Sequence, residues 1–213
     1  MKSEVLLASS INEVAKVMAE SFLNSPGYTY VFQNDETYRR SALEWLFEKK
    51  VSLIHRRCPT ALRGVLNEKG EVIACYLWIP SLHQNIPILE MIVGGLWQFP
   101  FRFGLSTLQR LLHAMDSQDH GEESFREYYD SSDVIMLEHF VVRPDYQSKG
   151  IGRKLLQEEI NLSGNSTLLL STQEDRNVKF YESLGYVITS KIDVAQEDQK
   201  YSFSSWFLIR KAN

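Results

Sequence analysis

The most informative segment of this sequence lies in its carboxyl-terminal third and reads Val142-Arg143-Pro144-Asp145-Tyr146-Gln147-Ser148-Lys149-Gly150-Ile151-Gly152. An apolar run precedes it, and residues with helical spacing follow it. Glycines at a strand-to-helix turn let the main chain approach a bulky anion, and the N–H groups at the start of a helix favour phosphate. The spacing has neither the Gly-Lys-Ser/Thr of a Walker loop nor the three glycines of a dinucleotide fingerprint. The segment therefore predicts an anion-binding turn, and an ordinary strand–helix turn is the alternative.

Strand and helix patterns alternate on both sides of this turn. Strands are expected at 134–142, 167–172, 187–190 and 206–209, and helices at 150–162 and 177–184. Gly185 follows the last helix at the C′ position, where glycine is favoured. Because mostly apolar strands alternate with helices, the pattern predicts an α/β layer with a covered sheet.

The amino-terminal part adds further elements to this layer. We expect strands at 5–8, 62–66 and 72–79, the last two forming a hairpin around a polar turn that ends in Gly70. A helix is expected to begin after Ser10 and to end near Pro26, with Ser10 and Glu13 as a capping box. A second helix is expected from Glu36 to about Ile54.

Residues 81–133 form the least regular part of the sequence. The run 97–103 alternates like a strand, although Pro100 lacks the donor that an interior strand uses. Residues 105–115 have helical spacing, and the acidic stretch 116–133 is typical of a loop or linker. The aromatic run is expected to wall a substrate pocket, to pack in the core or to form an exposed interaction patch. With no strong composition break, 1–213 is expected to be a single domain with a helical and loop insertion at about 81–133.

Composition limits the class of protein. The chain has 213 residues, of which 44% are apolar and 23% charged, as in a globular domain. A net charge of −4 gives no support for nucleic-acid binding. The two cysteines, Cys58 and Cys75, lack the spacing of metal ligands or of a disulfide framework. The first residues lack the apolar core of a signal peptide, and no apolar stretch is long enough for a membrane span. We therefore expect a cytoplasmic protein with no metal, nucleic-acid or membrane partner.

Two blocks of the chain resemble the GNAT N-acetyltransferase superfamily. Residues 142–152 are similar to its acyl-CoA pyrophosphate motif, Gln/Arg-x-x-Gly-x-Gly/Ala, and 177–186 resemble its later helix with the Phe-Tyr-Glu and Gly-Phe signature. The usual asparagine seven residues before the tyrosine is replaced by Glu174, and Asn177 lies four before it. A subset that includes acetyltransferases of the puromycin type shares this spacing, and the chain is closer to that subset. The resemblance extends from about Val134 to Tyr186.

The resemblance implies a mixed, mostly antiparallel central sheet, flanked by helices and splayed between the fourth and fifth strands. It also implies direct transfer of an acetyl group from acetyl-CoA, the co-substrate, to a primary amine. A small-molecule amine is the expected acceptor; a protein amino group and a non-catalytic acyl-CoA-binding module are the alternatives, and a homodimer stays open. Tyr181 would protonate the departing thiolate. The residues implied in cofactor binding are Phe140, Val141, Val142, Gln147, Ser148, Lys149, Gly150, Ile151, Gly152, Arg153 and Asn177.

Glu138 is the candidate general base for the incoming amine. It is the carboxylate inside the strand that leads to the anion-binding turn, and period-two alternation places it on one face with Met136 and Phe140. The alternative is a carboxylate paired with a buried cation or at a solvated strand end. The same alternation places His139 on the opposite face, where the expected role is that of a core histidine.

Overall fold

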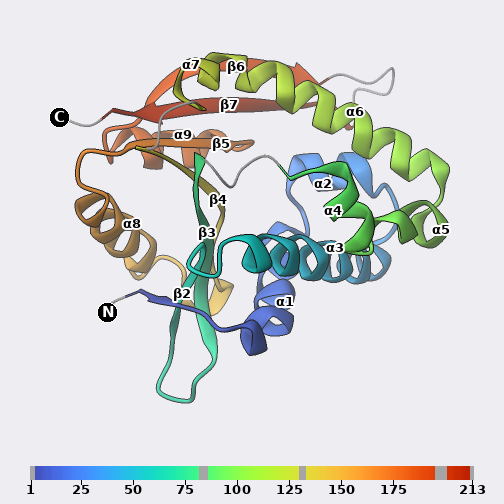
Figure 1. The fold of residues 1–213 in the computed structure, drawn as a ribbon, viewed down its shortest axis with the longest axis horizontal. Helices are drawn as coiled ribbons and strands as arrows, with labels where there is room; N and C mark the ends of the chain where they lie inside the picture. The colour runs from blue at the N-terminus through green and yellow to red at the C-terminus, as the bar shows by residue number, and fades with distance from the viewer. Residues whose placement is uncertain (1–2, 82–85, 130–132, 195–200, 212–213) are drawn as a thin grey trace.

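The computed structural model describes residues 3–81, 86–129, 133–194 and 201–211. Its centre is an open seven-stranded sheet with the order β1-β2-β3-β4-β5-β7-β6 (Figure 1). Every neighbouring pair in this sheet is antiparallel except β4 and β5, which run parallel. The predicted mixed and mostly antiparallel sheet is therefore confirmed.

The elements follow one another along the chain as helices and strands of ordinary length. The strands are β1 (Glu4–Val5), β2 (Leu62–Leu66), β3 (Val72–Pro80), β4 (Val134–Val142), β5 (Thr167–Thr172), β6 (Val187–Val194) and β7 (Phe203–Arg210). The α-helices are α1 (Ile11–Phe22), α2 (Pro26–Val31), α3 (Glu36–Arg57), α4 (Ile88–Val93), α5 (Phe99–Phe103), α6 (Leu105–Gly121), α7 (Arg126–Tyr129), α8 (Ile151–Leu162) and α9 (Asp175–Glu182). Short 3-10 turns are η1 (Ala8–Ser10), η3 (Leu96–Gln98), η4 (Glu122–Phe125) and η5 (Pro144–Tyr146).

Helices cover both faces of the sheet. Met136 of β4 packs in one apolar cluster with residues of α1 and α3, whereas its neighbour Leu137 packs in another cluster with residues of α8 and α9. This alternation is the period of two that a strand covered on both faces requires. We call the two sides the α1–α3 face and the α8–α9 face. Figure 1 shows α6 lying along β6 and β7 and extending the α1–α3 face.

The sheet parts between β4 and β5. Their pairing begins at Val134 with Thr167 and ends at Leu137 with Leu170. Beyond this point β4 stays paired with β3 as far as Val142, and β5 stays paired with β7 as far as Thr172. The two halves of the sheet thus separate after Leu137, which confirms the predicted splay between the fourth and fifth strands.

A β-bulge interrupts β4 beside the splay. Glu138 is opposite Leu77 and Val141 is opposite Cys75, so His139 and Phe140 together face a single residue of β3. His139 has a φ of 51°, in the left-handed region. The bulge shifts the alternation by one residue: His139 lies on the α1–α3 face with Glu138, while Phe140 packs on the α8–α9 face. The prediction that Glu138 shares a face with Phe140, and that His139 lies opposite, is therefore wrong.

The structure differs from the local sequence patterns in four other places. Residues 97–103, whose alternation resembles a strand apart from Pro100, are helical, in η3 and α5, where Pro100 occupies a first-turn position and its missing N–H costs nothing. The expected acidic loop at 116–133 is largely helical, in α6, η4 and α7, with 130–132 outside the described residues. Ser10 makes no side-chain cap: it ends η1 with helical backbone angles, and its N–H donates to the Leu7 carbonyl. The Glu13 carboxylate accepts a hydrogen bond from the Val72 N–H. The expected first strand at 5–8 is the two-residue β1 followed by η1.

Candidate active site

The loop between β4 and α8 has the backbone geometry of an anion-binding turn. Ser148 and Gly150 have φ values of 59° and 74°, both in the left-handed region. Gly150 is the N-cap of α8, and no side chain caps the first turn of that helix. The loop residues 147–150 are exposed. The N–H groups at the start of α8 are therefore available to an incoming anion.

Hydrogen bonds from three side chains, Gln147, Lys149 and Arg153, stabilise the loop and the start of α8. Gln147 Nε2 donates to the carbonyl of Val142 at 2.8 Å, and Lys149 Nζ donates to the carbonyl of Asp145 at 2.7 Å. Arg153 Nη2 donates to Ser183 Oγ at 2.7 Å and so ties the first turn of α8 to the end of α9. Of the residues predicted to bind a cofactor, Gln147 thus stabilises the loop through its side chain. A ligand would therefore meet mainly the main-chain N–H groups of the loop.

The first turn of α8 lies over the end of β4. A Cβ atom at Gly152 would lie 3.4 Å from Phe140 Cε1 and 3.6 Å from Val142 Cγ2, which is ordinary van der Waals contact. Ile151 also packs against the small cluster that holds Phe140 and Val142. The close approach places the exposed loop beside the part of β4 that no longer pairs with β5, Phe140, Val141 and Val142.

Tyr181 lies on α9 at the same splay. Its ring is buried in a cluster that also holds Leu137 and Leu170, the last pair of β4 and β5 before they part. The rings of Phe180 and Tyr186 lie 5.2 Å and 5.7 Å from it. Burial raises the pKa of the Tyr181 phenol well above its usual range, so the hydroxyl keeps its proton at neutral pH. A buried neutral phenol can donate a proton to a strong base that forms beside it.

Asn177 precedes Tyr181 by one helical turn. It lies in the first turn of α9 and is half-buried. Residues four apart on a helix share a face, so Asn177 and Tyr181 line the same side of α9. Asn177 and Tyr181 therefore face the same side of α9, although the asparagine lies four residues before the tyrosine and not the usual seven.

Glu138 lies on the other face, in an ion pair. Lys50 of α3 places its Nζ 2.6 Å from Glu138 Oε2, and His139 Nδ1 lies 3.4 Å from the same oxygen. Burial alone would raise the pKa of Glu138, but the charge of Lys50 and the interaction with His139 outweigh it and hold this pKa well below its usual range. Glu138 is therefore ionised at neutral pH and a weak proton acceptor. The structure therefore contains the alternative to a general base that the sequence left open, a carboxylate paired with a cation.

His139 has a polar partner on each side of its ring. Its Nε2 lies 3.0 Å from the hydroxyl of Tyr28 on α2, and the rings of Phe22 and Phe47 lie 5.5 Å and 5.1 Å away. Burial and the nearby charge of Lys50 lower the pKa of His139, so the imidazole is neutral at neutral pH. Sequence reasoning missed this cluster, because no motif links Tyr28 or Lys50 to β4.

Gln173 fixes the start of α2 over the splay. Its Oε1 accepts hydrogen bonds from the Gly27 N–H at 2.9 Å and from Ser25 Oγ at 3.3 Å. A Cβ atom at Gly27 would lie only 2.6 Å from the Gln173 amide, so a side chain there would push the two apart. Because Gln173 follows β5 directly, the contact positions Tyr28 next to the point where β4 and β5 separate.

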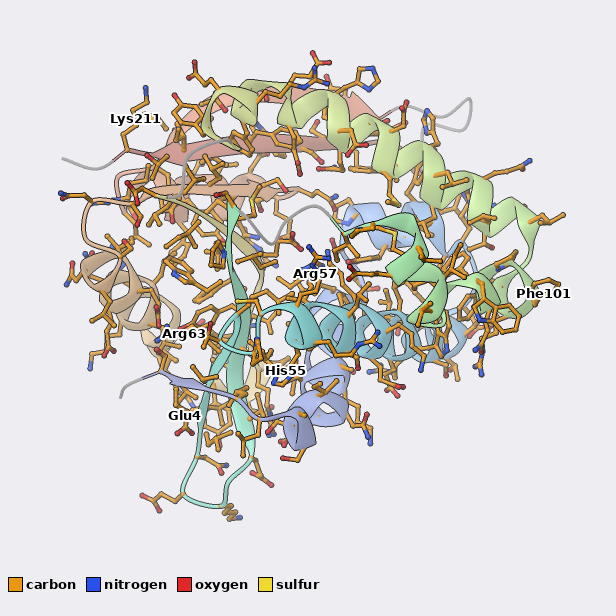
Figure 2. All side chains as sticks on the ribbon, viewed as in Figure 1. Glu4, His55, Arg57, Arg63, Phe101 and Lys211 are labelled. Carbon is orange, nitrogen blue, oxygen red and sulfur yellow. The ribbon has the colours of Figure 1, made fainter. Side chains whose placement is uncertain are left out.

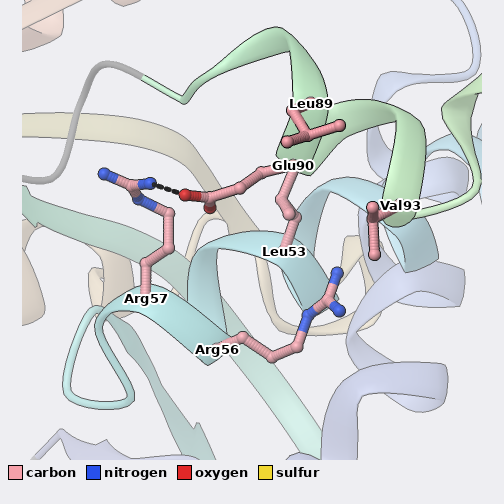
Figure 3. A pocket seen from close by; sticks show the side chains of 6 residues that line it. All are labelled: Leu53, Arg56, Arg57, Leu89, Glu90 and Val93. Carbon is pink, nitrogen blue, oxygen red and sulfur yellow. Dashed lines mark hydrogen bonds and ion pairs between the residues drawn. The ribbon is translucent and has the colours of Figure 1, made fainter.

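Two hollows lie away from this site. One, of about 350 Å³, is lined by Leu53, Arg56, Arg57, Leu89, Glu90 and Val93, between α3 and α4 (Figure 3). Arg57 Nη1 donates to Glu90 Oε1 across it at 2.7 Å. The other, of about 330 Å³, lies between α1 and α3. Neither is lined by a residue of β4, β5, α8 or α9.

The remaining candidates of the sequence analysis have ordinary environments. Part of the aromatic run packs inside, with Phe99 against Phe103 and Trp45. Trp97 and Phe101 are instead 56% and 82% exposed, and Figure 2 shows Phe101 at the outer edge of the molecule. Cys58 and Cys75 are free and buried. Within the described ranges, each helix is too short or too polar to span a membrane.

Comparison with known proteins finds one family match over part of the chain. A family model described as an acetyltransferase (GNAT) domain matches residues 111–188, which include β4, α8, β5 and α9. No curated protein matches the chain. The family match and the fold together confirm the resemblance to the GNAT superfamily; its puromycin-type subset stays a prediction.

Solved structures with the same fold cover nearly the whole chain. Arylalkylamine N-acetyltransferase 2 from Aedes aegypti matches with a TM-score of 0.67 and 12% identity, over 100% of this chain and 99% of that one. "Histone acetyltransferase HPA2 and related acetyltransferase" from Corynebacterium glutamicum matches with a TM-score of 0.62 and 14% identity, over 100% and 96%. A phosphinothricin acetyltransferase from Sinorhizobium meliloti, solved in complex with AcCoA, matches with a TM-score of 0.55 and 13% identity, over 100% and 88%. At sequence identities of 12–14%, this similarity shows a shared fold and nothing about the substrate.

Proposed function

We propose that this chain, whose family match and fold are those of the GNAT superfamily, transfers an acetyl group from acetyl-CoA to an amine. One observation carries the proposal: β4 and β5 part after Leu137 and Leu170, between an exposed anion-binding turn and a buried neutral tyrosine. The neighbour solved with AcCoA has the same fold, which supports acetyl-CoA as co-substrate.

The residues beside the splay fit a nucleotide thioester. The N–H groups of 148–153 would hold the pyrophosphate, because the turn is open and a Cβ atom at Gly150 would meet no atom within 4 Å. The main chain of Phe140, Val141 and Val142 has lost its β5 partner and would bind the pantetheine amides. Asn177 would reach the same arm from α9.

The chemistry needs one proton acceptor and one proton donor. Acetyl-CoA supplies an activated acyl group, and the amine attacks its carbonyl directly, so that the C–N bond forms as the C–S bond breaks. The Phe140 N–H would polarise the carbonyl, and Tyr181 would give its proton to the sulfur. An ammonium acceptor loses two protons when it becomes an amide. One balances the proton taken up by the thiol, and the other leaves to solvent.

The acceptor is proposed to be a small amine with an apolar or aromatic body. Phe22 and Tyr28, both partly buried, pack on the fully buried Phe47 beside His139 on the α1–α3 face, opposite Tyr181. Such an aromatic wall suits an arylalkyl group, and one structural neighbour is named for arylalkylamines. Because another structural neighbour is named for histones, a protein amino group is the second candidate acceptor.

A thiol-release assay with purified protein and acetyl-CoA tests the proposal. A panel of arylalkyl, alkyl and antibiotic amines is run beside amino-terminal and lysine peptides, and calorimetry measures acetyl-CoA binding separately. We expect binding and amine-dependent thiol release, with arylalkylamines favoured over peptides. Binding without release in any arm would make the chain an acyl-CoA-binding module. Absence of binding would contradict the acetyltransferase assignment and favour an interaction role for the exposed Trp97 and Phe101.

A further inference from the structure

We propose that Tyr28 and His139 form the relay that removes a proton from the acceptor amine, and that Glu138, paired with Lys50, orients the His139 ring. The inference rests on the proposed acetyl transfer and deepens it, because it assigns the proton acceptor. It also replaces Glu138 as the base, since the ion pair with Lys50 at 2.6 Å occupies that carboxylate.

Three separate elements bring this cluster together on the α1–α3 face. Tyr28 comes from α2, Lys50 from α3, and Glu138 with His139 from β4. Regular alternation would send His139 to the other face, and only the bulge turns it toward Tyr28. The bulge requires a left-handed φ of 51°, which side chains with a Cβ adopt rarely and which persists where the surroundings fix it. Strain of this kind concentrates at functional sites.

The distances define a direction for the proton. His139 Nδ1 faces Glu138 Oε2 at 3.4 Å, and Nε2 faces the Tyr28 hydroxyl at 3.0 Å. We assign the hydrogen of the neutral imidazole to Nδ1, the ring nitrogen that faces the carboxylate; at 3.4 Å the contact is electrostatic, and neither Nδ1 nor Oε2 has a hydrogen-bond partner among the described residues. Nε2 then accepts the Tyr28 O–H, and the phenol oxygen is left to accept a hydrogen from the amine.

The proton transfers of the relay form no tyrosinate at Tyr28, and the one cation they form on the protein, the His139 imidazolium, lies beside the Glu138 carboxylate. A proton passes from the ammonium nitrogen to the Tyr28 oxygen while the Tyr28 proton passes to His139 Nε2. The phenol therefore stays neutral throughout, and the imidazolium that forms faces the negative charge of Glu138. His139 returns this first proton to solvent. Tyr181 gives its proton to the sulfur and recovers one from the attacking nitrogen, which loses its second proton as the amide forms. The ammonium and thioester thus give an amide, a thiol and one released proton.

The groups that face His139 from every packed element agree with this assignment. They are Tyr28 from α2, Phe22 from α1, Phe47 and Lys50 from α3, and Glu138 from β4. Burial and Lys50 lower the pKa of His139 while Glu138 opposes them, and the result lies below the usual value. Burial, aided by Glu138, raises the pKa of Tyr28 well above its usual range. At neutral pH the imidazole is thus unprotonated at Nε2, where it accepts a hydrogen bond, and the phenol of Tyr28 is the donor.

The chain contains a matched control for this pair. Tyr30, two residues along α2, bonds through its hydroxyl to His113 Nδ1 of α6 at 2.5 Å. This second pair also joins a tyrosine of α2 to a histidine, but the histidine belongs to α6 and not to β4. Removing the Tyr30 hydroxyl or the His113 ring therefore measures what the loss of a tyrosine–histidine contact does to the fold alone.

The experiment measures thiol release against pH for Tyr28→Phe and His139→Asn, with Tyr30→Phe and His113→Asn as controls. Asparagine at 139 tolerates the left-handed backbone. We expect turnover of both site variants to fall by about 10²-fold or more with strongly basic amines, with unchanged acetyl-CoA affinity by calorimetry. The controls keep the wild-type rate. Wild-type turnover and pH profile in Tyr28→Phe, which keeps its ring and should fold, would overturn the relay even if His139→Asn failed to fold.

A second measurement does not depend on activity. Long-range ¹H–¹⁵N NMR spectra of the histidine rings report protonation and tautomer in the intact protein. We expect His139 to be neutral at pH 7 with its hydrogen on Nδ1, and to titrate below its usual range. Protonation at pH 7, or hydrogen on Nε2, would overturn the inference. If the wild type releases no thiol with any amine, the proposed function fails. If it does and the site variants match it, the relay alone fails.

Discussion

The two faces of the sheet differ sharply in chemistry where β4 and β5 part. On the α1–α3 face, Glu138 and Lys50 form an ion pair beside His139; Lys50 and His139 overcome burial to lower the pKa of the carboxyl, and burial together with Lys50 lowers the pKa of the imidazole. On the α8–α9 face, Tyr181 lies among leucines and tyrosine, and burial alone raises its pKa. One face thus holds a neutral acceptor and the other a neutral donor. The comparison shows how a splayed sheet can keep the two apart within one site.

The largest expected effect concerns the α8–α9 face. Tyr181→Phe removes the hydroxyl and keeps the ring that packs against Phe180 and Tyr186, so the free energy of unfolding should change little. Turnover should fall by about 10²–10⁴-fold, because the proton is needed only as the C–S bond breaks. Acetyl-CoA affinity should be unchanged, since a neutral thioester sulfur is a poor acceptor.

A donor with a less basic leaving thiol checks this prediction. It needs the Tyr181 proton less, so it should recover part of the lost turnover. An equal deficit with both donors would leave Tyr181 as a positioning residue, and wild-type turnover would remove it from the mechanism.

The next effect distinguishes the two candidate bases on the α1–α3 face. Glu138→Gln should lower turnover by about tenfold or more, less than the 10²–10⁴-fold typical of the base itself. Because Glu138 raises the pKa of His139, its loss should move the acidic limb of the pH–rate profile to lower pH. Disappearance of the limb would instead make Glu138 the base.

Lys50→Met is the matched variant for that test. Lys50 lowers the pKa of His139, so its removal should move the acidic limb to higher pH, the opposite direction. Shifts of the same sign in both variants would contradict the arrangement in which the two charges act on one imidazole.

A smaller effect is expected at the anion-binding turn. A Cβ atom at Gly150 meets open space, but the φ of 74° disfavours any residue with a side chain. Gly150→Ala should therefore lower the free energy of unfolding by about 1 kcal/mol, measured by urea denaturation. Acetyl-CoA affinity of the folded variant should fall, since close approach of the pyrophosphate depends on this backbone. Gly70→Ala, also at positive φ with open space but in the β2–β3 turn, is the control that should keep wild-type affinity.

The smallest effect concerns the contact that joins the two halves of the site. Gln173→Ala removes the oxygen that accepts hydrogen bonds from the Gly27 N–H and from Ser25 Oγ. Each of these hydrogen bonds contributes about 1 kcal/mol to the free energy of unfolding. Looser docking of α2 should raise the KM for the amine several-fold, with acetyl-CoA affinity unchanged. An unchanged KM would show that α2 holds Tyr28 in place without Gln173.

The sequence by itself determined the parts of the molecule that depend on local chemistry. Apolar runs placed β4 and β5 at their observed bounds, and Gly150 marked the start of α8. The spacing of Asn177 and Tyr181 on one helix needed no knowledge of the fold. Where a local pattern fitted two structures, as at 97–103, alternation alone did not decide between them; Pro100 in the first turn and the packing of Phe99 against Phe103 both suit the helix found there.

Only the tertiary structure decided the acceptor side of the site. The bulge at His139 arises from the register between β3 and β4, and a one-residue shift sends a side chain to the other face. Lys50 and Tyr28 reach β4 from helices far away in the sequence, so no spacing predicts their contacts with Glu138 and His139. Their effect on the pKa values follows from distance and burial, which are properties of the folded chain and not of its order of residues.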